Sequence, residues 1–119
     1  MRHAVLSISE ERVAGAIRNT VLAHSGYGVI PAANAHEALR ILGSRHVCAM
    51  VIPSSVPRDD QRMLCIEGKK RGVASVVLDP YGPLNSGDRE VHFNPLDGPE
   101  AFLKVLESAV LRDHRLCIA

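Results

Sequence analysis

Two apolar stretches near the middle of the 119-residue chain decide its fold: Val47-Cys48-Ala49-Met50-Val51-Ile52 and Val73-Ala74-Ser75-Val76-Val77-Leu78. Each has the length of a β-strand and is apolar almost throughout. This composition is typical of strands that are covered on both faces, as in a parallel sheet between two layers of helices. The two stretches therefore predict the central strands of an α/β domain.

Outside these stretches, short apolar runs alternate with longer segments of helical periodicity, and the order β then α occurs five times. The other predicted strands are Ala4–Ile8, Gly28–Ala32 and Val91–Phe93. Apolar residues recur at helical spacing at Ala14, Ile17, Val21 and Leu22, and Asn34 with Glu37 has the spacing of a capping box. A last helix is predicted to open at Asp97.

Pro31 constrains how the predicted strands are arranged. Because proline cannot donate a hydrogen bond to a ladder, the second strand is expected at a sheet edge or bulged there. Right-handed crossovers between alternating strands and helices produce a doubly wound sheet, and the flavodoxin-like order 2-1-3-4-5 places the second strand at an edge. We therefore predict a single α/β domain over residues 1–119, with a five-stranded parallel sheet in this order.

The composition excludes several classes of protein. Hydrophobic residues make up 46% of the chain and charged residues 23%, which is typical of a globular domain and not of a disordered segment. The formal net charge of +1 provides no broad cationic field, so we expect no direct binding of nucleic acid. No apolar stretch approaches the ~18 residues needed to cross a bilayer, so we expect a cytoplasmic protein without membrane contact.

The cysteines and histidines indicate no metal or disulfide framework. Cys48, Cys65 and Cys117 form no CxxC pair, and we expect reduced thiols, with Cys117 the most accessible. The six histidines fall on different predicted elements without the spacing of metal ligands. The sequence therefore predicts no metal site and no cofactor.

Six local motifs follow one another along nearly the whole chain. They are Val5–Glu10, Ser25–Val29, Ala35–Leu39, Ala49–Pro57, Val76–Asp79 and Phe93–Leu96. Their order resembles that of the receiver domain of bacterial two-component response regulators, of the chemotaxis-receiver type. The resemblance implies a bacterial signalling domain that is not an enzyme and whose partner is a histidine kinase or another regulator domain.

The positions that carry phosphoryl transfer in that family correspond here to residues that cannot perform it. By the resemblance, the phosphoacceptor position is Pro53, which has no side-chain oxygen to act as a nucleophile. The acidic metal-binding positions are Ser9 and Glu10, which leave one carboxylate and should hold Mg²⁺ poorly. The lysine position is the uncharged Asn94, and the switch hydroxyl position is Asp79, whose carboxylate would repel a phosphoryl group. The resemblance therefore implies a degenerate receiver, or pseudo-receiver.

The segment before the last strand is also unusual for a receiver. Pro80–Glu90 contains two prolines and two glycines, and a βαβ crossover needs at least about 10 residues, so we expect the fourth helix to be short or missing. On the last helix, Leu103 and Leu111 lie outside the main apolar stripe. Together with Val91 and Phe93 they form the predicted interaction surface, for a protein partner or for homodimerisation.

Two hypotheses about function result. The first is a degenerate receiver that acts as a phosphorylation-independent protein-interaction module in phosphorelay-type signal transduction. The alternative is a small-ligand sensor or enzyme that reuses the strand-end pocket, with Glu10, Asp79 and Asn94 as its polar groups. The first is favoured because no third ligand group is identifiable beside Glu10 and Asp79.

Overall fold

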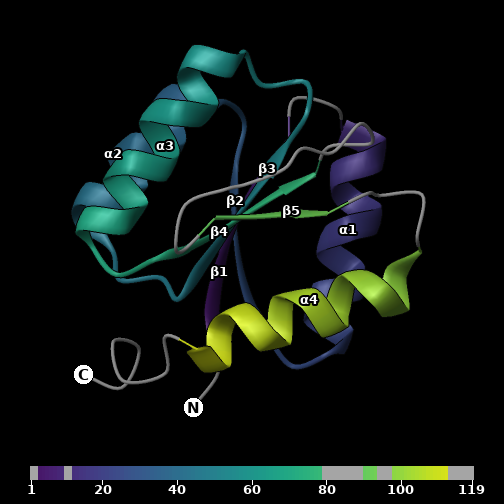
Figure 1. Ribbon diagram of the computed structural model, residues 1–119. Helices are drawn as coiled ribbons and strands as arrows, with labels where there is room; N and C mark the ends of the chain where they lie inside the picture. The colour runs from purple at the N-terminus through teal and green to yellow at the C-terminus, as the bar shows by residue number, and fades with distance from the viewer. Residues whose placement is uncertain (1–2, 10–11, 79–89, 94–97, 113–119) are drawn as a thin grey trace.

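The computed structural model describes residues 3–9, 12–78, 90–93 and 98–112, and this part of the chain forms five strands and four helices (Figure 1). The strands are β1 (Ala4–Ile8), β2 (Gly28–Ala32), β3 (Ala49–Pro53), β4 (Ala74–Leu78) and β5 (Glu90–Phe93). The helices are α1 (Arg12–His24), α2 (Ala35–Ser44), α3 (Arg58–Lys70) and α4 (Pro99–Arg112). No described helix is both long and apolar enough to span a membrane.

The strands form one parallel sheet in the order β2-β1-β3-β4-β5. Helices α2 and α3 cover one face of the sheet, and α1 and α4 cover the other (Figure 1). The predicted flavodoxin-like α/β architecture and the order 2-1-3-4 are confirmed, and β5 pairs with β4 at the far edge. The prediction of a short or missing fourth helix falls on residues 79–89, outside the described residues.

The position of Pro31 agrees with this order. It lies in β2, at a sheet edge, where it is exposed and stands opposite Ser7 of β1. Because an edge strand has a single neighbour, a proline there leaves the central ladders intact.

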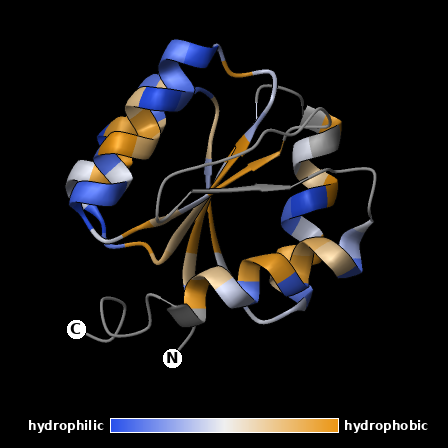
Figure 2. Cartoon of the chain, viewed as in Figure 1, coloured by the Kyte–Doolittle hydropathy of each residue, from blue (hydrophilic) through white to orange (hydrophobic). Residues whose placement is uncertain are grey.

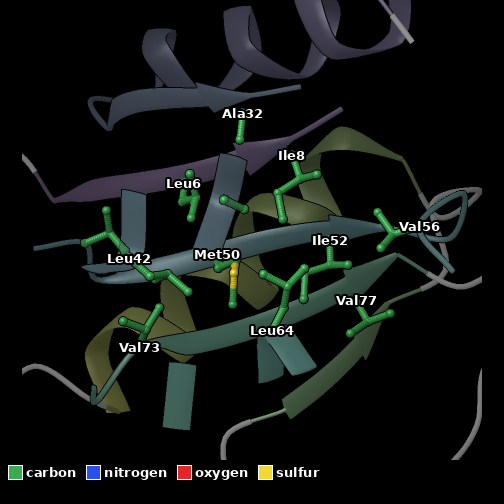
Figure 3. Packing of buried hydrophobic residues seen from close by; sticks show 12 residues of the cluster. Leu6, Ile8, Ala32, Leu42, Met50, Ile52, Val56, Leu64, Val73 and Val77 are labelled. Atoms are coloured by element: carbon green, nitrogen blue, oxygen red, sulfur yellow. The ribbon is translucent and has the colours of Figure 1, made fainter. Parts of the chain in front are cut away.

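The core consists of two clusters of buried side chains, one on each face of the sheet. On the α1 and α4 side, the cluster includes Val5, Leu22, Val51, Val76 and Leu106. On the α2 and α3 side, shown in Figure 3, it includes Leu6, Ile8, Met50, Ile52 and Leu64. Every residue from Val47 to Ile52 is at most 3% exposed, which confirms the two-sided burial predicted for this stretch.

Helix α2 begins as the sequence predicts. Asn34 Oδ1 accepts a hydrogen bond from the backbone N–H of Glu37 at 2.9 Å, and Glu37 Oε1 accepts one from the N–H of Ala33 at 3.3 Å. These bonds satisfy donors that a helix leaves unpaired at its start. The capping box therefore sets the boundary between the edge strand β2 and α2.

Among the described residues, four large apolar side chains are exposed, two on each of two helices: Val13 (74%) and Ile17 (62%) on α1, and Met63 (47%) and Ile66 (51%) on α3. Helical periodicity grouped Ile17 with the apolar stripe of α1, and the structure corrects this. Among the residues of α1 whose burial is described, Gly15 and Leu22 are buried and lie seven positions apart, so Ile17 lies off the face that meets the sheet.

The capping box predicts the stability of a matched pair of variants. Asn34→Ala removes the acceptor for the Glu37 N–H and should lower the free energy of unfolding by about 1 kcal/mol, measured by urea denaturation. Asn34→Ser keeps a side-chain acceptor and should remain close to the parent chain. Equal stabilities of the two variants would contradict the role of the cap.

Candidate functional site

The carboxyl ends of the parallel strands meet at one edge of the sheet, where open α/β sheets bind ligands. Ser7 of β1 pairs with Val51 of β3, so Ser9 and Pro53, each two residues further on, are neighbours at this edge. The backbone N–H of Ser9 donates to the carbonyl of Ala32 at 2.9 Å, which extends the pairing of β1 with β2. The structure thus brings together two of the five predicted pocket residues. The other three lie outside the described residues: Glu10, Asp79 and Asn94.

Pro53 is the last residue of β3 and opens the loop to α3. It pairs with Leu78 of β4 and is half-buried. Its carbonyl accepts a hydrogen bond from the Val56 N–H at 3.2 Å, which turns the chain, and Ser54 and Ser55 are exposed in this turn. Because the proline ring presents only carbon atoms, the end of β3 offers no side-chain nucleophile.

Ser9 lies against the first turns of α1. A Cβ atom built on the buried Gly15 would come within 2.5 Å of Ser9 Oγ and 2.7 Å of Ser9 Cβ. These distances are shorter than van der Waals contact, so only glycine allows α1 to approach the end of β1 this closely. A small side chain at position 9 and a glycine at position 15 together close the space between helix and strand.

Arg18, which the sequence reasoning missed, lies beside this edge as a partly buried cation. Its Nε donates to Ser7 Oγ at 3.1 Å, and its Nη2 donates to the carbonyl oxygen of Ile8. Burial lowers the pKa of the Arg18 guanidinium below its ordinary value. No described carboxylate forms an ion pair with it. The sequence signal was its position three residues after Gly15 and four before Leu22, which places Arg18 on the sheet-facing side of α1.

The residues described at the end of β1 are poor ligands for a metal ion. Within the described ranges, no three His, Cys, Asp or Glu side chains are grouped so that they could hold a metal ion. A guanidinium has donors and no acceptor, so Arg18 cannot ligate Mg²⁺, which requires oxygen ligands. The donor set that is described at the end of β1 therefore does not fit a magnesium ion.

The other predicted functional residues are only partly described. Leu103 of α4 is half-buried and packs against the core, so it presents less apolar surface than the sequence predicts. The side chains of Val91, Phe93 and Leu111 lie outside what the structure describes. Cys48 is buried with its Sγ 3.5 Å from His3 Nδ1, Cys65 is half-buried, and Cys117 lies outside the described residues.

Comparison with known proteins identifies the architecture. The signal receiver domain of an HD domain-containing protein from Pseudomonas fluorescens Pf-5 superimposes with a TM-score of 0.82 over 97% of this chain and 99% of that chain, at 19% identity. This chain has the fold of a response-regulator receiver domain. A CheY-like receiver domain from Methanospirillum hungatei JF-1 matches it with a TM-score of 0.79 at 17% identity, over 97% of this chain and 98% of that chain.

A third similar structure is also a receiver domain. The receiver domain from the hybrid histidine kinase CckA matches with a TM-score of 0.75 at 14% identity, over 90% of this chain and 98% of that chain. In sequence, no family model and no curated protein matches the chain. The likeness to receivers is therefore one of fold.

The contact between α1 and Ser9 predicts that alanine substitution affects stability differently at Gly15, which lies in this contact, and at Gly43, which does not. Gly15→Ala should destabilise the fold by about 1–3 kcal/mol, because the new methyl group overlaps Ser9. Gly43→Ala, where a Cβ meets nothing within 4 Å, should be neutral or stabilising by up to about 1 kcal/mol. Urea denaturation of both variants tests this, and a Gly15→Ala variant as stable as the parent would refute the close approach.

The hydrogen bonds of the Arg18 guanidinium predict how a single and a double variant differ in their free energies of unfolding. Arg18→Met leaves the buried Ser7 hydroxyl and the Ile8 carbonyl without their donor and should lower the free energy of unfolding by about 1–3 kcal/mol. Adding Ser7→Ala removes one unsatisfied group, so the double variant should recover part of this loss. The same denaturation assay applies, and an Arg18→Met variant more stable than the parent would contradict the assignment.

Proposed function

We propose that this receiver-like chain binds a protein partner without being phosphorylated, as a module of two-component signal transduction. The observation that supports this most strongly is Pro53 at the end of β3, in the position that the resemblance gives to the phosphoacceptor. Phosphoryl transfer to a protein requires a nucleophile, a metal ion and positive charge beside the phosphoryl oxygens. A side chain without an oxygen, nitrogen or sulfur atom removes the first requirement.

The surroundings of Pro53 support the same proposal. Ser9 stands where the resemblance places an acidic metal ligand, and α1 closes against it at Gly15. The nearby Arg18 adds a positive charge at the end of β1, and a cation there opposes the approach of a divalent metal ion. These three residues therefore turn the end of β1 from a metal-binding edge into a closed, hydrogen-bonded contact.

A surface for the partner is available on α1. The described exposed residues of this helix are Val13, Ala16, Ile17, Thr20, Ala23 and His24, and we refer to them as the α1 outer face. A solvent-facing helix surface usually carries charged residues, whereas this one carries none with a permanent charge. Val13 and Ile17 lie four residues apart and form one stripe, whose burial by a partner would contribute about 1.5–3 kcal/mol for each side chain.

The partner class follows from the fold. We propose a histidine kinase or another regulator domain, since receiver domains occur in such assemblies and one of the similar structures is the receiver of a hybrid histidine kinase. The predicted contribution of Val91, Phe93, Leu103 and Leu111, and of homodimerisation through them, stays a prediction. The α1 outer face is preferred because Val13 and Ile17 are the most exposed of the large apolar side chains that the structure describes.

Phosphorylation can be tested directly. Incubation with acetyl phosphate and Mg²⁺ should leave the intact mass of the protein unchanged, because Pro53 offers no nucleophile. A receiver domain with an aspartate at this position, treated in parallel, should gain a phosphoryl group. A stoichiometric, acid-labile adduct on this chain would overturn the proposal.

Partner binding can be tested with matched apolar pairs. The probes are purified dimerisation domains of the histidine kinases, and separate regulator domains, from the source organism, measured by calorimetry without a phosphoryl donor. Val13→Ser/Ile17→Ser should weaken binding by more than about tenfold, whereas Met63→Ser/Ile66→Ser should not change it. Binding that requires a phosphoryl donor, or that is insensitive to the α1 variant, would contradict the proposal.

The alternative function, a small-ligand sensor or enzyme at the strand-end pocket, depends on Glu10, Asp79 and Asn94. These residues lie outside the described residues, so the alternative stays a prediction.

A further inference from the structure

A concave site lies where β3 and β4 begin, at the end of the sheet opposite the carboxyl ends of the strands. It is a depression of about 320 Å³ between the ends of α2 and α3. The residues that line it are Leu42, Gly43, Ser44, Arg45, His46, Val47, Arg71 and Val73. None of them belongs to the strand-end pocket or to the α1 outer face.

The apolar part of the lining comes from the core. Leu42, Val47 and Val73 are at most 3% exposed, and all three belong to the cluster under α2 and α3. Figure 3 shows Leu42 and Val73 at the end of this cluster that lies away from Val56. These side chains are nearly covered, so the depression lies over a rigid part of the core and the surface that a ligand could reach is mainly polar.

The rim of the depression is cationic. Arg45 directly follows α2, Arg71 directly follows α3, and the side chains of both are exposed, as is that of His46. Lys69 and Lys70 precede Arg71, and in Figure 2 both ends of α3 are coloured as hydrophilic. Of the four permanent cations at these two helix ends, Lys70 and Arg71 pair with Glu67, and Arg45 and Lys69 form no ion pair with a described carboxylate.

Helix capping does not account for all of this charge. Cations at a helix carboxyl end commonly compensate its unpaired carbonyl groups. At the end of α3, however, backbone N–H groups already satisfy these carbonyls: Arg71 donates to Glu67 and Gly68, Gly72 donates to Lys69, and Val73 donates to Gly68. Gly72 has a φ of 73°, the left-handed conformation that closes a helix in this way.

The end of α2 is capped internally as well. The N–H of Arg45 donates to the Ile41 carbonyl at 2.8 Å, and Ser44 Oγ donates to the Arg40 carbonyl at 3.2 Å. The Arg45 side chain is therefore not needed as a cap, and it forms no ion pair with a described carboxylate. Arg71 Nε lies 3.3 Å from Glu67 Oε2, but Lys70 Nζ, at 3.7 Å from Oε1, shares the same carboxylate.

We propose that this depression binds the phosphate group of a small phosphorylated molecule, with Arg45 and Arg71 as the anion-binding residues. Two guanidinium groups from separate helix ends match the planar, two-point hydrogen bonding that arginine makes with phosphate. The proposal is independent of the function proposed above, because it uses neither Pro53 nor α1.

Binding can be measured by ¹⁵N–¹H correlation spectra of the full chain during titration with inorganic phosphate and with phenyl phosphate at constant ionic strength. We expect saturable shifts confined to residues 42–47 and 71–73 in both titrations, because the two guanidinium groups bind the phosphate group that the two probes share. Arg45→Gln/Arg71→Gln should weaken binding at least about tenfold. Arg58→Gln/Arg62→Gln, at the other end of α3, should leave it unchanged.

Several results would overturn this proposal. They are shifts that do not saturate, shifts reproduced by chloride, or full affinity in the Arg45→Gln/Arg71→Gln variant. If that double variant loses its fold, the single variant Arg45→Gln is the test, because the Arg45 side chain forms no hydrogen bond or ion pair with the described residues. The single variant should bind phenyl phosphate several-fold more weakly than the parent chain.

Discussion

Burial of β3 between two helical layers is the constraint on which the rest of the structure depends. The residues from Val47 to Ile52 are almost without solvent contact, and from Ala49 to Ile52 their side chains alternate between the clusters under α1/α4 and α2/α3. This burial holds β1 and β4 against β3 in fixed register. The carboxyl ends of the three strands therefore lie together at one end of the sheet, and the packing of the core fixes where the loops after these strands begin.

We propose that the chemistry of that edge differs from that of a phosphorylated receiver, although the fold is the same. Pro53 ends β3 without a nucleophilic atom, Ser9 replaces an acidic position of the resemblance, and Arg18 donates to β1 from α1. Each change alone would be a small alteration of a receiver. Together they favour a role in which the fold displays surfaces and does not transfer a phosphoryl group, and the apolar stripe of Val13 and Ile17 is the surface best suited to a protein.

Much of the fold could be predicted from the sequence because strong local patterns determine it. Continuous apolar runs predicted β3 and β4, Pro31 predicted the edge position of β2, and the pair Asn34 and Glu37 predicted the start of α2. These signals work because they depend on residues close together in the chain. The assignment of Ile17 to the buried stripe was wrong because periodicity alone does not determine which face of an amphipathic helix meets the sheet.

The candidate sites were less predictable because they depend on contacts between residues that are far apart in the chain. The bond from Arg18 to Ser7 joins residues of two elements, and the close approach of Gly15 to Ser9 is decided by how the helix packs. The cationic depression likewise requires the ends of α2 and α3 to lie side by side. In the sequence alone, its arginines cannot be distinguished from the cations that commonly occur at helix carboxyl ends.

The central claim is that the edge formed by Ser9 and Pro53 no longer holds a divalent metal ion. Titration with Mn²⁺, followed by paramagnetic broadening of backbone amide signals, tests this directly. We predict that the amides of Ser9, Ser54 and Ser55 broaden no more than other exposed amides. Selective loss of these signals at low Mn²⁺ concentration, reversed by Mg²⁺, would show an intact metal site and contradict the account.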